Sequence, residues 1–340
     1  MNTRALFSSA LLSGSFLLAP AMVSAAEINI YTTREPQLIQ PLIEAFTASS
    51  GTKVNAVFLK DGLAERVATE GESSPADLLM TVDAGNLVDL VEKGITQPVD
   101  SAVLSDAIPE QLRDANGHWF GLSMRARVIY AAKDLDLATF NYEELADPKW
   151  KGKICIRSGQ HPYNTALFAA YLAHHGAEET EKWLTAVKDN LARKAAGGDR
   201  DGAKDILGGI CDIAVANSYY VGLMRSGKGG EDQVKWAEAI KVVLPTFKDG
   251  GTQVNISGAA VAKHSPNKAD AVKFLEYLVS DEAQKIYAEA NYEYPVKVNV
   301  AADPIIASFG ELKIDSKPLS EVVSHRKQAS ELVDKVGFDN

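Results

Sequence analysis

Two adjacent tyrosines, Tyr219 and Tyr220, lie where side chains commonly bind ligands. They follow a short apolar run, Ile213 to Ala216, which is typical of a strand, and they precede a predicted helix. Open α/β sheets bind their ligands at the carboxyl ends of their strands. A phenol oxygen is a hard donor, and a bound trivalent cation can displace its proton although the ordinary pKa of tyrosine is about 10. The pair therefore indicates a metal site, with the alternative that both residues are half-buried aromatics that only begin a helix.

The first 25 residues have the composition of an export signal. Arg4 supplies a positive charge, Ala5 to Met22 is apolar but interrupted by small residues, and Val23 to Ala26 is typical of a cleavage site. The apolar run is too short and too broken to span a bilayer, and no later segment is apolar enough. We therefore predict cleavage near Ala25 or Ala26, and a mature periplasmic chain with no stable membrane insertion.

Composition and missing motifs exclude several function classes. The chain carries 35 basic and 45 acidic residues, a formal net charge of −10, which argues against nucleic acid or an anionic membrane surface as partner. The sequence has no Gly-x-Ser-x-Gly elbow, no His-Glu-x-x-His, no phosphate-binding loop and no dinucleotide fingerprint. We therefore expect a protein that is not an enzyme.

The chain has two cysteines, Cys155 and Cys211. An even number in an exported chain favours one disulfide, because the periplasm is oxidising. A two-thiolate metal site is the alternative, but the chain has no further cysteine and no histidine pair at a metal-binding spacing. Both cysteines lie in apolar, strand-like runs, which we expect to be neighbours in one sheet.

The elements that must position these residues alternate between strand and helix. In the segment Gln37 to Ser49, apolar Leu38, Leu42 and Phe46 recur at four-residue steps, as in an amphipathic helix. Alternation of this kind predicts a mostly parallel sheet with helices on both faces. The other elements expected in the first part of the chain are strands at 27–33, 52–59 and 76–82, and helices at 63–70 and 86–93.

About 315 mature residues, at roughly 150 per domain, suggest two domains. Two β-rich stretches, Trp119 to Ala131 and Gln253 to Ala262, are predicted to cross between them, and a second alternating unit runs from Lys153 to Phe247. Helices are expected at 268–279, 281–289 and 319–336. We predict an N-terminal lobe of residues 27–126 plus 253–300 and a C-terminal lobe of residues 127–252 plus 301–340, joined by a hinge that closes on a ligand.

The mature chain resembles the extracytoplasmic solute-binding proteins of ABC importers, and specifically their iron(III)-binding branch. Paired tyrosines with a third tyrosine upstream mark that branch. The resemblance covers nearly all of the mature chain and rests on the segments Ile28–Arg34, Ser74–Leu79 with Thr81–Asp83, Arg125–Val128, Trp150–Lys153, Arg157–Ser158 with Tyr163–Asn164, Asn217–Tyr220, Ser257–Ala260 and Tyr294–Val296.

This resemblance implies a type II periplasmic binding protein-like α/β fold and a metal site on Tyr163, Tyr219 and Tyr220, with Tyr163 in the loop after the strand of Cys155. The chemistry agrees, because iron(III) prefers anionic oxygen donors and three phenolates balance its charge. A Cys155–Cys211 disulfide would hold the two ligand-bearing strands side by side. The implied cargo is iron(III), and the implied partner is an inner-membrane ABC permease with its ATPase, served by a monomer.

The first loop departs from many iron-binding relatives. Where they carry a histidine ligand this chain has Glu35 and Pro36, and a common carboxylate position falls on Val82. Other relatives complete the coordination with a carbonate held by arginine, since a guanidinium fork matches a planar anion. The resemblance thus implies an anion clamp of Arg34 with Arg127 or Arg125. Salt bridges between the lobes are the alternative role of these arginines, and Glu35 or water is an alternative ligand.

Three histidines are not expected to bind the metal. We expect His161 to support the site without binding metal, and we expect His174 and His175, which diverge around a helix, to be solvated.

The alternative function is that of a sister binding protein for a small organic solute, such as a polyamine, thiamine or a sugar. Such a site would need carboxylates or stacked aromatics in the cleft, and it would not need three tyrosines.

Overall fold

The computed structural model describes residues 26–340, so the predicted signal peptide of residues 1–25 lies outside the described residues. The strands are β1 (Glu27–Thr32), β2 (Lys53–Phe58), β3 (Leu78–Thr81), β4 (Thr96–Gln97), β5 (Phe120–Ala132), β6 (Ile154–Cys155), β7 (Ile213–Asn217), β8 (Ile240–Val243), β9 (Val254–Ala262) and β10 (Tyr294–Pro295). The α-helices are α1 (Pro36–Ser50), α2 (Leu63–Glu70), α3 (Ala84–Glu92), α4 (Ala102–Ala107), α5 (Pro162–Asp189), α6 (Asp199–Leu207), α7 (Tyr219–Arg225), α8 (Glu231–Glu238), α9 (Lys268–Leu278), α10 (Asp281–Asn291), α11 (Pro304–Ala307), α12 (Leu319–Ser324) and α13 (Arg326–Val336). Short 3₁₀ helices are η1 (Gly71–Ser73), η2 (Glu110–Leu112), η3 (Tyr142–Ala146) and η4 (Pro148–Trp150).

The strands form a mixed sheet in the order β2-β1-β3-β9-β5-β7-β6. The first three strands are parallel, as their βαβαβ order predicts, and β6 is parallel to β7. The expectation of a mostly parallel sheet is wrong for the molecule as a whole. The two crossing strands are antiparallel to their neighbours. Strand β9 is antiparallel to both β3 and β5, and β5 is antiparallel to β7.

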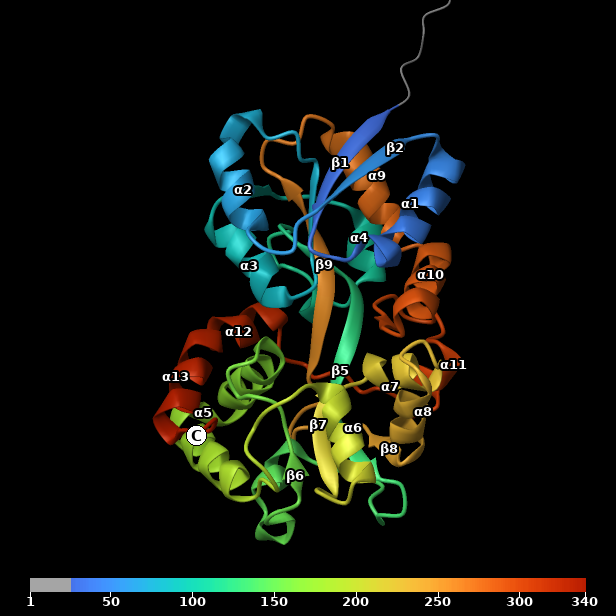
Figure 1. Cartoon of the computed structure of the whole chain (residues 1–340). Helices are drawn as coiled ribbons and strands as arrows, with labels where there is room; N and C mark the ends of the chain where they lie inside the picture. The colour runs from blue at the N-terminus through green and yellow to red at the C-terminus, as the bar shows by residue number, and fades with distance from the viewer. Residues whose placement is uncertain (1–25) are drawn as a thin grey trace, which may run out of the picture.

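Strands β5 and β9 connect an upper and a lower lobe, as Figure 1 shows. The 13-residue β5 pairs with β9 from Phe120 to Ala126 and with β7 from Arg127 to Ala131. Almost every residue of both strands is buried. We propose that the lobe boundary lies where β5 exchanges partners, between Ala126 and Arg127.

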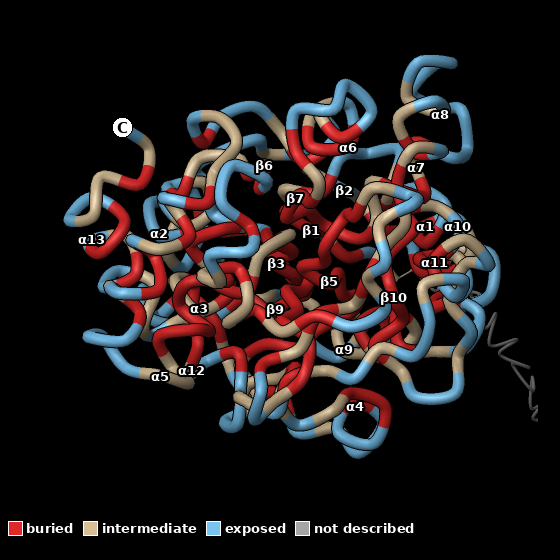
Figure 2. The backbone as a smooth tube through the Cα atoms, turned by 90° about the horizontal axis from the view of Figure 1, so that it is seen from below, coloured by how far each residue is buried: buried red, intermediate tan, exposed pale blue. Residues whose placement is uncertain are grey.

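Buried side chains gather along the sheet and beneath the helices that cover it. Figure 2 shows the buried backbone concentrated around β1, β3, β5 and β9, while the exposed segments lie at the periphery. A second core cluster lies in the lower lobe, where residues of α5 such as Phe168 and Leu184 pack against Val333 of α13 and neighbouring residues. Burial of apolar surface at about 25 cal/mol per Å² makes these two cores the main source of stability. None of the helices of the described residues is long and apolar enough to cross a membrane.

The C-terminal helix differs from its prediction. A single helix over residues 319–336 was expected, but the chain forms α12 and α13 with His325 between them. The break lets α12 contact α3 of the upper lobe while α13 packs along α5 of the lower lobe. The helical periodicity of the sequence does not distinguish one helix from two that bend around a neighbour.

The predicted disulfide joins Cys155 and Cys211, with 5.9 Å between their Cα atoms. Cys155 lies in β6, but Cys211 lies two residues before β7 and not within a strand as expected. Because β6 pairs with β7 through Cys155 and Ala214, the bond still fixes these two strands side by side.

Removing this bond is expected to lower the free energy of unfolding. The cysteines are separated by 56 residues in sequence. A crosslink over such a loop restricts the unfolded chain, which corresponds to about 4 kcal/mol. Urea unfolding of Cys155→Ala/Cys211→Ala should show this loss, and wild type reduced with dithiothreitol should match the variant. A loss below about 1 kcal/mol would contradict this role.

Candidate metal centre

Three predicted tyrosines from two elements meet in the lower lobe. Tyr219 and Tyr220 begin α7, directly after β7, and Tyr163 lies in the first turn of α5 and not in a loop as expected. The hydroxyl oxygens of Tyr163 and Tyr219 are 3.2 Å apart. The ring centroids of Tyr219 and Tyr220 are 4.2 Å apart. The structure thus brings together the phenols that the sequence singled out.

Local hydrogen bonds fix where both tyrosine-bearing helices begin. The backbone N–H of Ser218 donates to the carbonyl of Ala126, and the N–H of Ala126 donates to the Ser218 hydroxyl, so α7 starts against the crossing strand β5. Helix α5 starts at Pro162, whose fixed φ suits the first helical position. The N–H of Tyr163 donates to Nδ1 of His161, which caps the helix.

His161 therefore supports Tyr163 and is not itself placed as a ligand by these contacts. Its ring packs edge-on against the Tyr163 ring, with 4.5 Å between centroids. Burial and the neighbouring Arg157 lower the pKa of His161 to about 4. A neutral ring can accept the amide proton of Tyr163 throughout the physiological range, which agrees with a supporting role.

Tyr219 and Tyr220 keep their protons when no cation is bound. Burial raises the pKa of Tyr219 well above its ordinary value, and the charges of Tyr163 and Tyr220 raise it further. Burial, followed by Tyr163, also raises the pKa of Tyr220. Three phenolates in one half-buried place repel one another, so they form only around a strong positive charge that displaces their protons.

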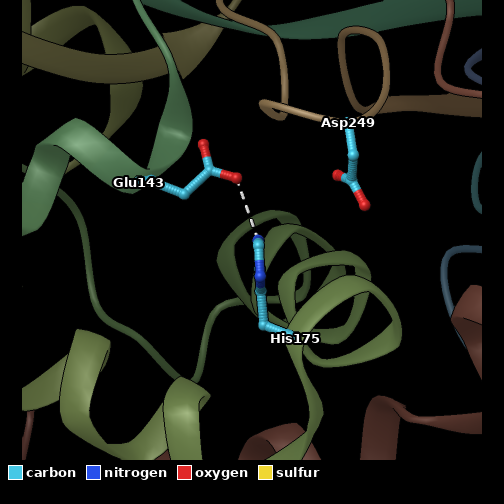
Figure 3. A group of neighbouring side chains, drawn as sticks. All are labelled: Glu143, His175 and Asp249. Carbon is cyan, nitrogen blue, oxygen red and sulfur yellow. Dashed lines mark hydrogen bonds and ion pairs between the residues drawn. The ribbon is translucent and has the colours of Figure 1, made fainter.

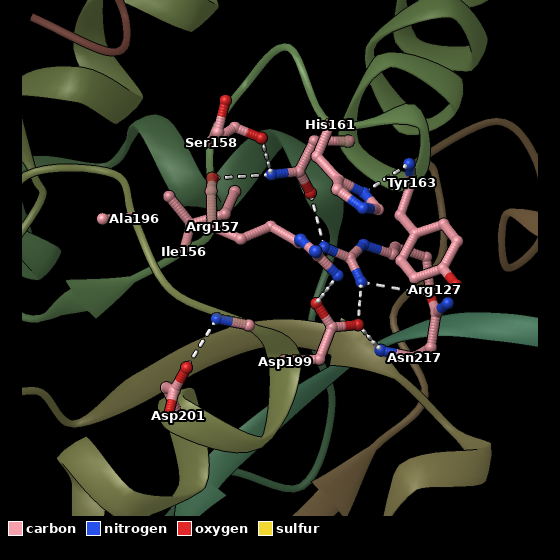
Figure 4. Close-up of polar contacts among 12 residues, drawn as sticks. Arg127, Ile156, Arg157, Ser158, His161, Tyr163, Ala196, Asp199, Asp201 and Asn217 are labelled. Atoms are coloured by element: carbon pink, nitrogen blue, oxygen red, sulfur yellow. Dashed lines mark hydrogen bonds and ion pairs between the residues drawn. The ribbon is translucent and has the colours of Figure 1, made fainter.

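A buried ion-pair network lies beneath Tyr163, as Figure 4 shows. Arg127 Nη1 is 2.6 Å from Asp199 Oδ2, and Arg157 Nη1 is 3.3 Å from Asp199 Oδ1. The guanidinium carbons of Arg127 and Arg157 lie 5.9 and 5.1 Å from the centre of the Tyr163 ring. Two guanidinium groups share one carboxylate, so one positive charge remains in excess beside the tyrosines, which favours anionic ligands there.

Both terminal nitrogens of Arg127 bind within this ion-pair network. It also donates to Oδ1 of Asn217 at 3.0 Å and to Oδ1 of Asn164, so both terminal nitrogens have partners within the lower lobe. Arg157 was missed as a site residue, although Arg157–Ser158 was among the segments that carried the family resemblance. The terminal nitrogens of Arg127 are thus engaged, while its Nε is buried and has no hydrogen-bond partner in the described part of the chain.

Arg34 lies at the end of β1 and is buried. Its Nη2 is 2.9 Å from Glu293 and also donates to the Ser257 hydroxyl. Burial would raise the pKa of Glu293, but Arg34 and Arg125 outweigh that effect and the pKa is lowered. The salt bridge of Arg34 thus lies within the predicted N-terminal lobe, and not between the lobes as the alternative supposed.

Arg125 faces the centre from the crossing strand β5. Its Nη2 donates to the carbonyl of Val82 and lies 3.8 Å from Asp83, and its guanidinium carbon is 5.8 Å from the centre of the Tyr163 ring. Its Nη1 is buried and has no hydrogen-bond partner among residues 26–340. A buried donor without a partner costs about 1–3 kcal/mol. The Nε atoms of Arg127 and Arg157 are likewise buried without a partner within the described residues, so each of these arginines has a nitrogen that could bind an anion.

Two further residues of the predicted site, Glu35 and Val82, make other contacts. Glu35 is exposed at the start of α1, where its carboxylate accepts a hydrogen bond from Gln37. Val82 contributes only its carbonyl, as acceptor for Arg125.

A cavity of about 770 Å³ opens between the lobes beside Tyr163. Its walls come from the start of α3, including Asp83 and Asn86, from the start of α5, including His161, and from α13, including Arg326. The wall residues come from both of the proposed lobes, so the cavity lies between them. Of the three tyrosines Tyr163 lines this cavity, and its hydroxyl contacts that of Tyr219, whereas Tyr220 lines a separate hollow beside Arg157 and Asp199.

Known proteins match this chain over nearly its whole length. Residues 73–308 match the family model described as bacterial extracellular solute-binding protein. The Bordetella ferric binding protein is 66% identical, with a TM-score of 0.90 over 92% of this chain and 100% of its own. Ferric iron-Binding Protein A of Mannheimia haemolytica, in an open conformation, is 47% identical, with a TM-score of 0.88 over 93% of this chain and 100% of its own. Iron uptake protein A2 of Synechocystis is 40% identical over 94% of this chain and 92% of its own length. These likenesses confirm the predicted periplasmic binding protein-like fold.

Proposed function

The chain belongs to the family of bacterial extracellular solute-binding proteins, and from this premise we propose that it captures iron(III) in the periplasm for an ABC importer. The main support for this proposal is that Tyr163, Tyr219 and Tyr220 lie close together. The hydroxyl oxygens of Tyr163 and Tyr219 are 3.2 Å apart. Three phenolates balance the charge of iron(III) and supply the hard oxygen donors that it prefers. The matched proteins are named for binding or taking up iron, which supports the same cargo.

The matched proteins carry the names of binding and uptake proteins, and this chain is likewise a binding protein and not an enzyme. The lower lobe would gather the ion on its tyrosines, and the upper lobe would close over it at the crossing strands. The closed monomer would then deliver its cargo to a membrane permease that an ATPase drives. Membership of the family supports such a permease as the partner.

An anion held by Arg125 completes the proposed coordination, with carbonate as the best-fitting class because a planar anion matches the guanidinium fork. Arg34 stays a candidate second contact, although Glu293 already occupies one of its nitrogens. The tight ion pair of Arg127 makes it the weakest of the three arginine candidates. Water or Glu35 is the alternative source of the remaining ligands.

The substitution Arg125→Gln is expected to weaken iron(III) binding in bicarbonate by about 10- to 100-fold, as for the loss of a hydrogen bond to a charged group of about 1.5–3 kcal/mol. Competition with a chelator, measured with and without bicarbonate, should show that the variant no longer responds to the anion. Arg66→Gln, which removes an arginine paired with Glu70 on α2, is the matched control and should bind as wild type does. A variant that keeps its full bicarbonate dependence would exclude Arg125 as the anion ligand.

Iron affinity is expected to fall as the pH falls. Because the pKa values of Tyr219 and Tyr220 are raised, protons compete with the ion across the whole physiological range. Each phenol that loses a proton on binding contributes up to about tenfold per pH unit, so three phenols give up to about 1,000-fold. Chelator competition at a series of pH values measures this slope. An affinity independent of pH would contradict binding through phenolates.

A thermal-unfolding panel separates iron(III) from the alternative cargo. A ligand at about 1,000 times its Kd stabilises the folded state by about 4 kcal/mol. We expect such a shift with iron(III) supplied as citrate, and none with spermidine, thiamine or a sugar. A shift with an amine or thiamine and none with iron(III) would select the organic-solute alternative.

A further inference from the structure

A second group of metal-binding side chains lies in the lower lobe, apart from the tyrosines. Glu143 of η3, His175 of α5 and Asp249 of the loop between β8 and β9 face one another, as Figure 3 shows. One potential ligand atom from each lies within 4.8 Å of the others. We propose that these three residues bind a divalent transition-metal cation, with Zn²⁺ as the ion that best fits their chemistry.

The environment of Glu143 independently favours a bound cation. Its side chain is only 10% exposed. Its Oε1 lies 2.9 Å from Nε2 of His175 and accepts the backbone N–H of Lys248 at 3.1 Å. Its Oε2 is buried and has no hydrogen-bond partner in the described part of the chain. A buried carboxylate oxygen without a partner is costly, and a cation bound between Glu143 and Asp249 would supply that partner.

His174, next to His175, supports the site from behind. Its Nδ1 lies 3.0 Å from Asp249 and its Nε2 lies 2.9 Å from Asp315. Carboxylates that bind a metal are usually held by an outer shell of polar groups, and the ring of His174 lies beside Asp249 in this way, although its Nδ1 makes no hydrogen bond within the described residues. The expectation that His174 is solvated is therefore wrong, because its side chain is only 3% exposed and its ring stacks on Phe247.

The donor set fits a transition metal better than calcium or magnesium. One imidazole nitrogen and two carboxylates suit Zn²⁺, with water in the fourth position, whereas calcium and magnesium prefer oxygen ligands alone. Nε2 of His175 and Oε1 of Glu143 are 2.9 Å apart as a hydrogen-bonded pair, so Zn²⁺ would bind by displacing the proton between them. Asp249 is 64% exposed at its side chain, which gives an ion access from solvent.

The position of the site links it to the crossing strands. Asp249 lies five residues before β9, and Gln253, the residue before β9, donates its N–H to the Tyr142 hydroxyl. That hydroxyl donates to the carbonyl of Arg127 in β5. A cation on Glu143 and Asp249 would therefore join η3 and α5 to the segment that enters the upper lobe, at the lower end of both crossing strands.

Calorimetric titration of the mature protein with zinc chloride tests the proposal. We expect one equivalent of Zn²⁺ to bind, both in wild type and in Tyr219→Phe/Tyr220→Phe, where the tyrosine centre is disabled. The substitutions Asp249→Asn and His175→Gln should each weaken this binding by at least about tenfold, the lower limit for losing a supporting contact. Asp249 is exposed, so Asp249→Asn should fold normally, and His264→Gln, at an exposed histidine elsewhere, is the control.

Three results would overturn the proposal. They are the absence of zinc binding in wild type, equal affinity in wild type and both cluster variants, and the loss of the zinc equivalent in the double tyrosine variant. The last result would place zinc at the tyrosines. Because the test uses zinc and does not require iron, a failure of the iron(III) proposal would leave it intact.

Discussion

Replacing Tyr219 and Tyr220 together by phenylalanine is expected to lower iron(III) affinity by more than about 100-fold, the upper range for losing only an outer-shell partner of a metal. The substitution keeps both rings, which lie 4.2 Å apart, and removes two of the three anionic donors. Only Tyr163 would remain, and one phenolate neither balances a trivalent charge nor fills its coordination. Chelator competition with the mature protein measures the change.

The stability of this variant distinguishes lost ligands from a damaged fold. Phenylalanine keeps the ring packing and removes one hydroxyl contact, that of Tyr219 with Tyr163, so we expect the urea midpoint without iron to change little. Tyr277→Phe is the matched control, because it removes a tyrosine hydroxyl on α9, away from the centre, that has no hydrogen-bond partner within residues 26–340. If the double variant bound iron(III) as tightly as this control does, the ligand assignment would be wrong.

The substitution Asp199→Asn is expected to destabilise the lower lobe by about 3–5 kcal/mol, the usual loss when one partner of a buried ion pair is removed. Asp199 is buried between Arg127 and Arg157, and its Oδ2 also accepts the backbone N–H of Asn217 at 2.8 Å. An amide cannot compensate two guanidinium charges. Since both arginines pack beside Tyr163, iron affinity should fall as well.

Urea unfolding of the iron-free protein measures the first effect. Asp232→Asn provides the comparison, because Asp232 pairs with Lys235 on the surface of α8, where a salt bridge contributes at most about 1 kcal/mol. Equal stability of the two variants would mean that the Asp199 network does not hold the lobe together. An unstable Asp199→Asn protein that still bound iron(III) normally would separate folding from the placement of Tyr163.

The chemistry of the centre could be predicted where it depends on local sequence. Tyr219 and Tyr220 follow an apolar strand, and the end of a strand is a defined place in an α/β sheet. The disulfide followed from an even cysteine count in an exported chain. The crossing strands at Trp119–Ala131 and Gln253–Ala262 lie within one residue of β5 and β9, because long buried apolar runs are distinct from helices.

The side-chain contacts of the site could not be predicted, because they join residues that are distant in sequence. Arg127 resembled a free cleft arginine, but its carboxylate partner Asp199 lies 72 residues away and only the folded chain brings them together. The same is true of His174 and Asp315, which are separated by 141 residues. The directions of the crossing strands were also missed, since helix and strand periodicity carries no information about which strands pair.

A visible absorption titration of the purified mature protein with ferric citrate, with and without bicarbonate, tests the three-tyrosine iron(III) centre most directly. We predict a tyrosinate-to-iron charge-transfer band that saturates at one equivalent and requires bicarbonate. A band that is independent of bicarbonate would keep the tyrosines and assign the remaining positions to water or Glu35. If no band appeared as ferric citrate was added, that result would contradict the iron(III) centre.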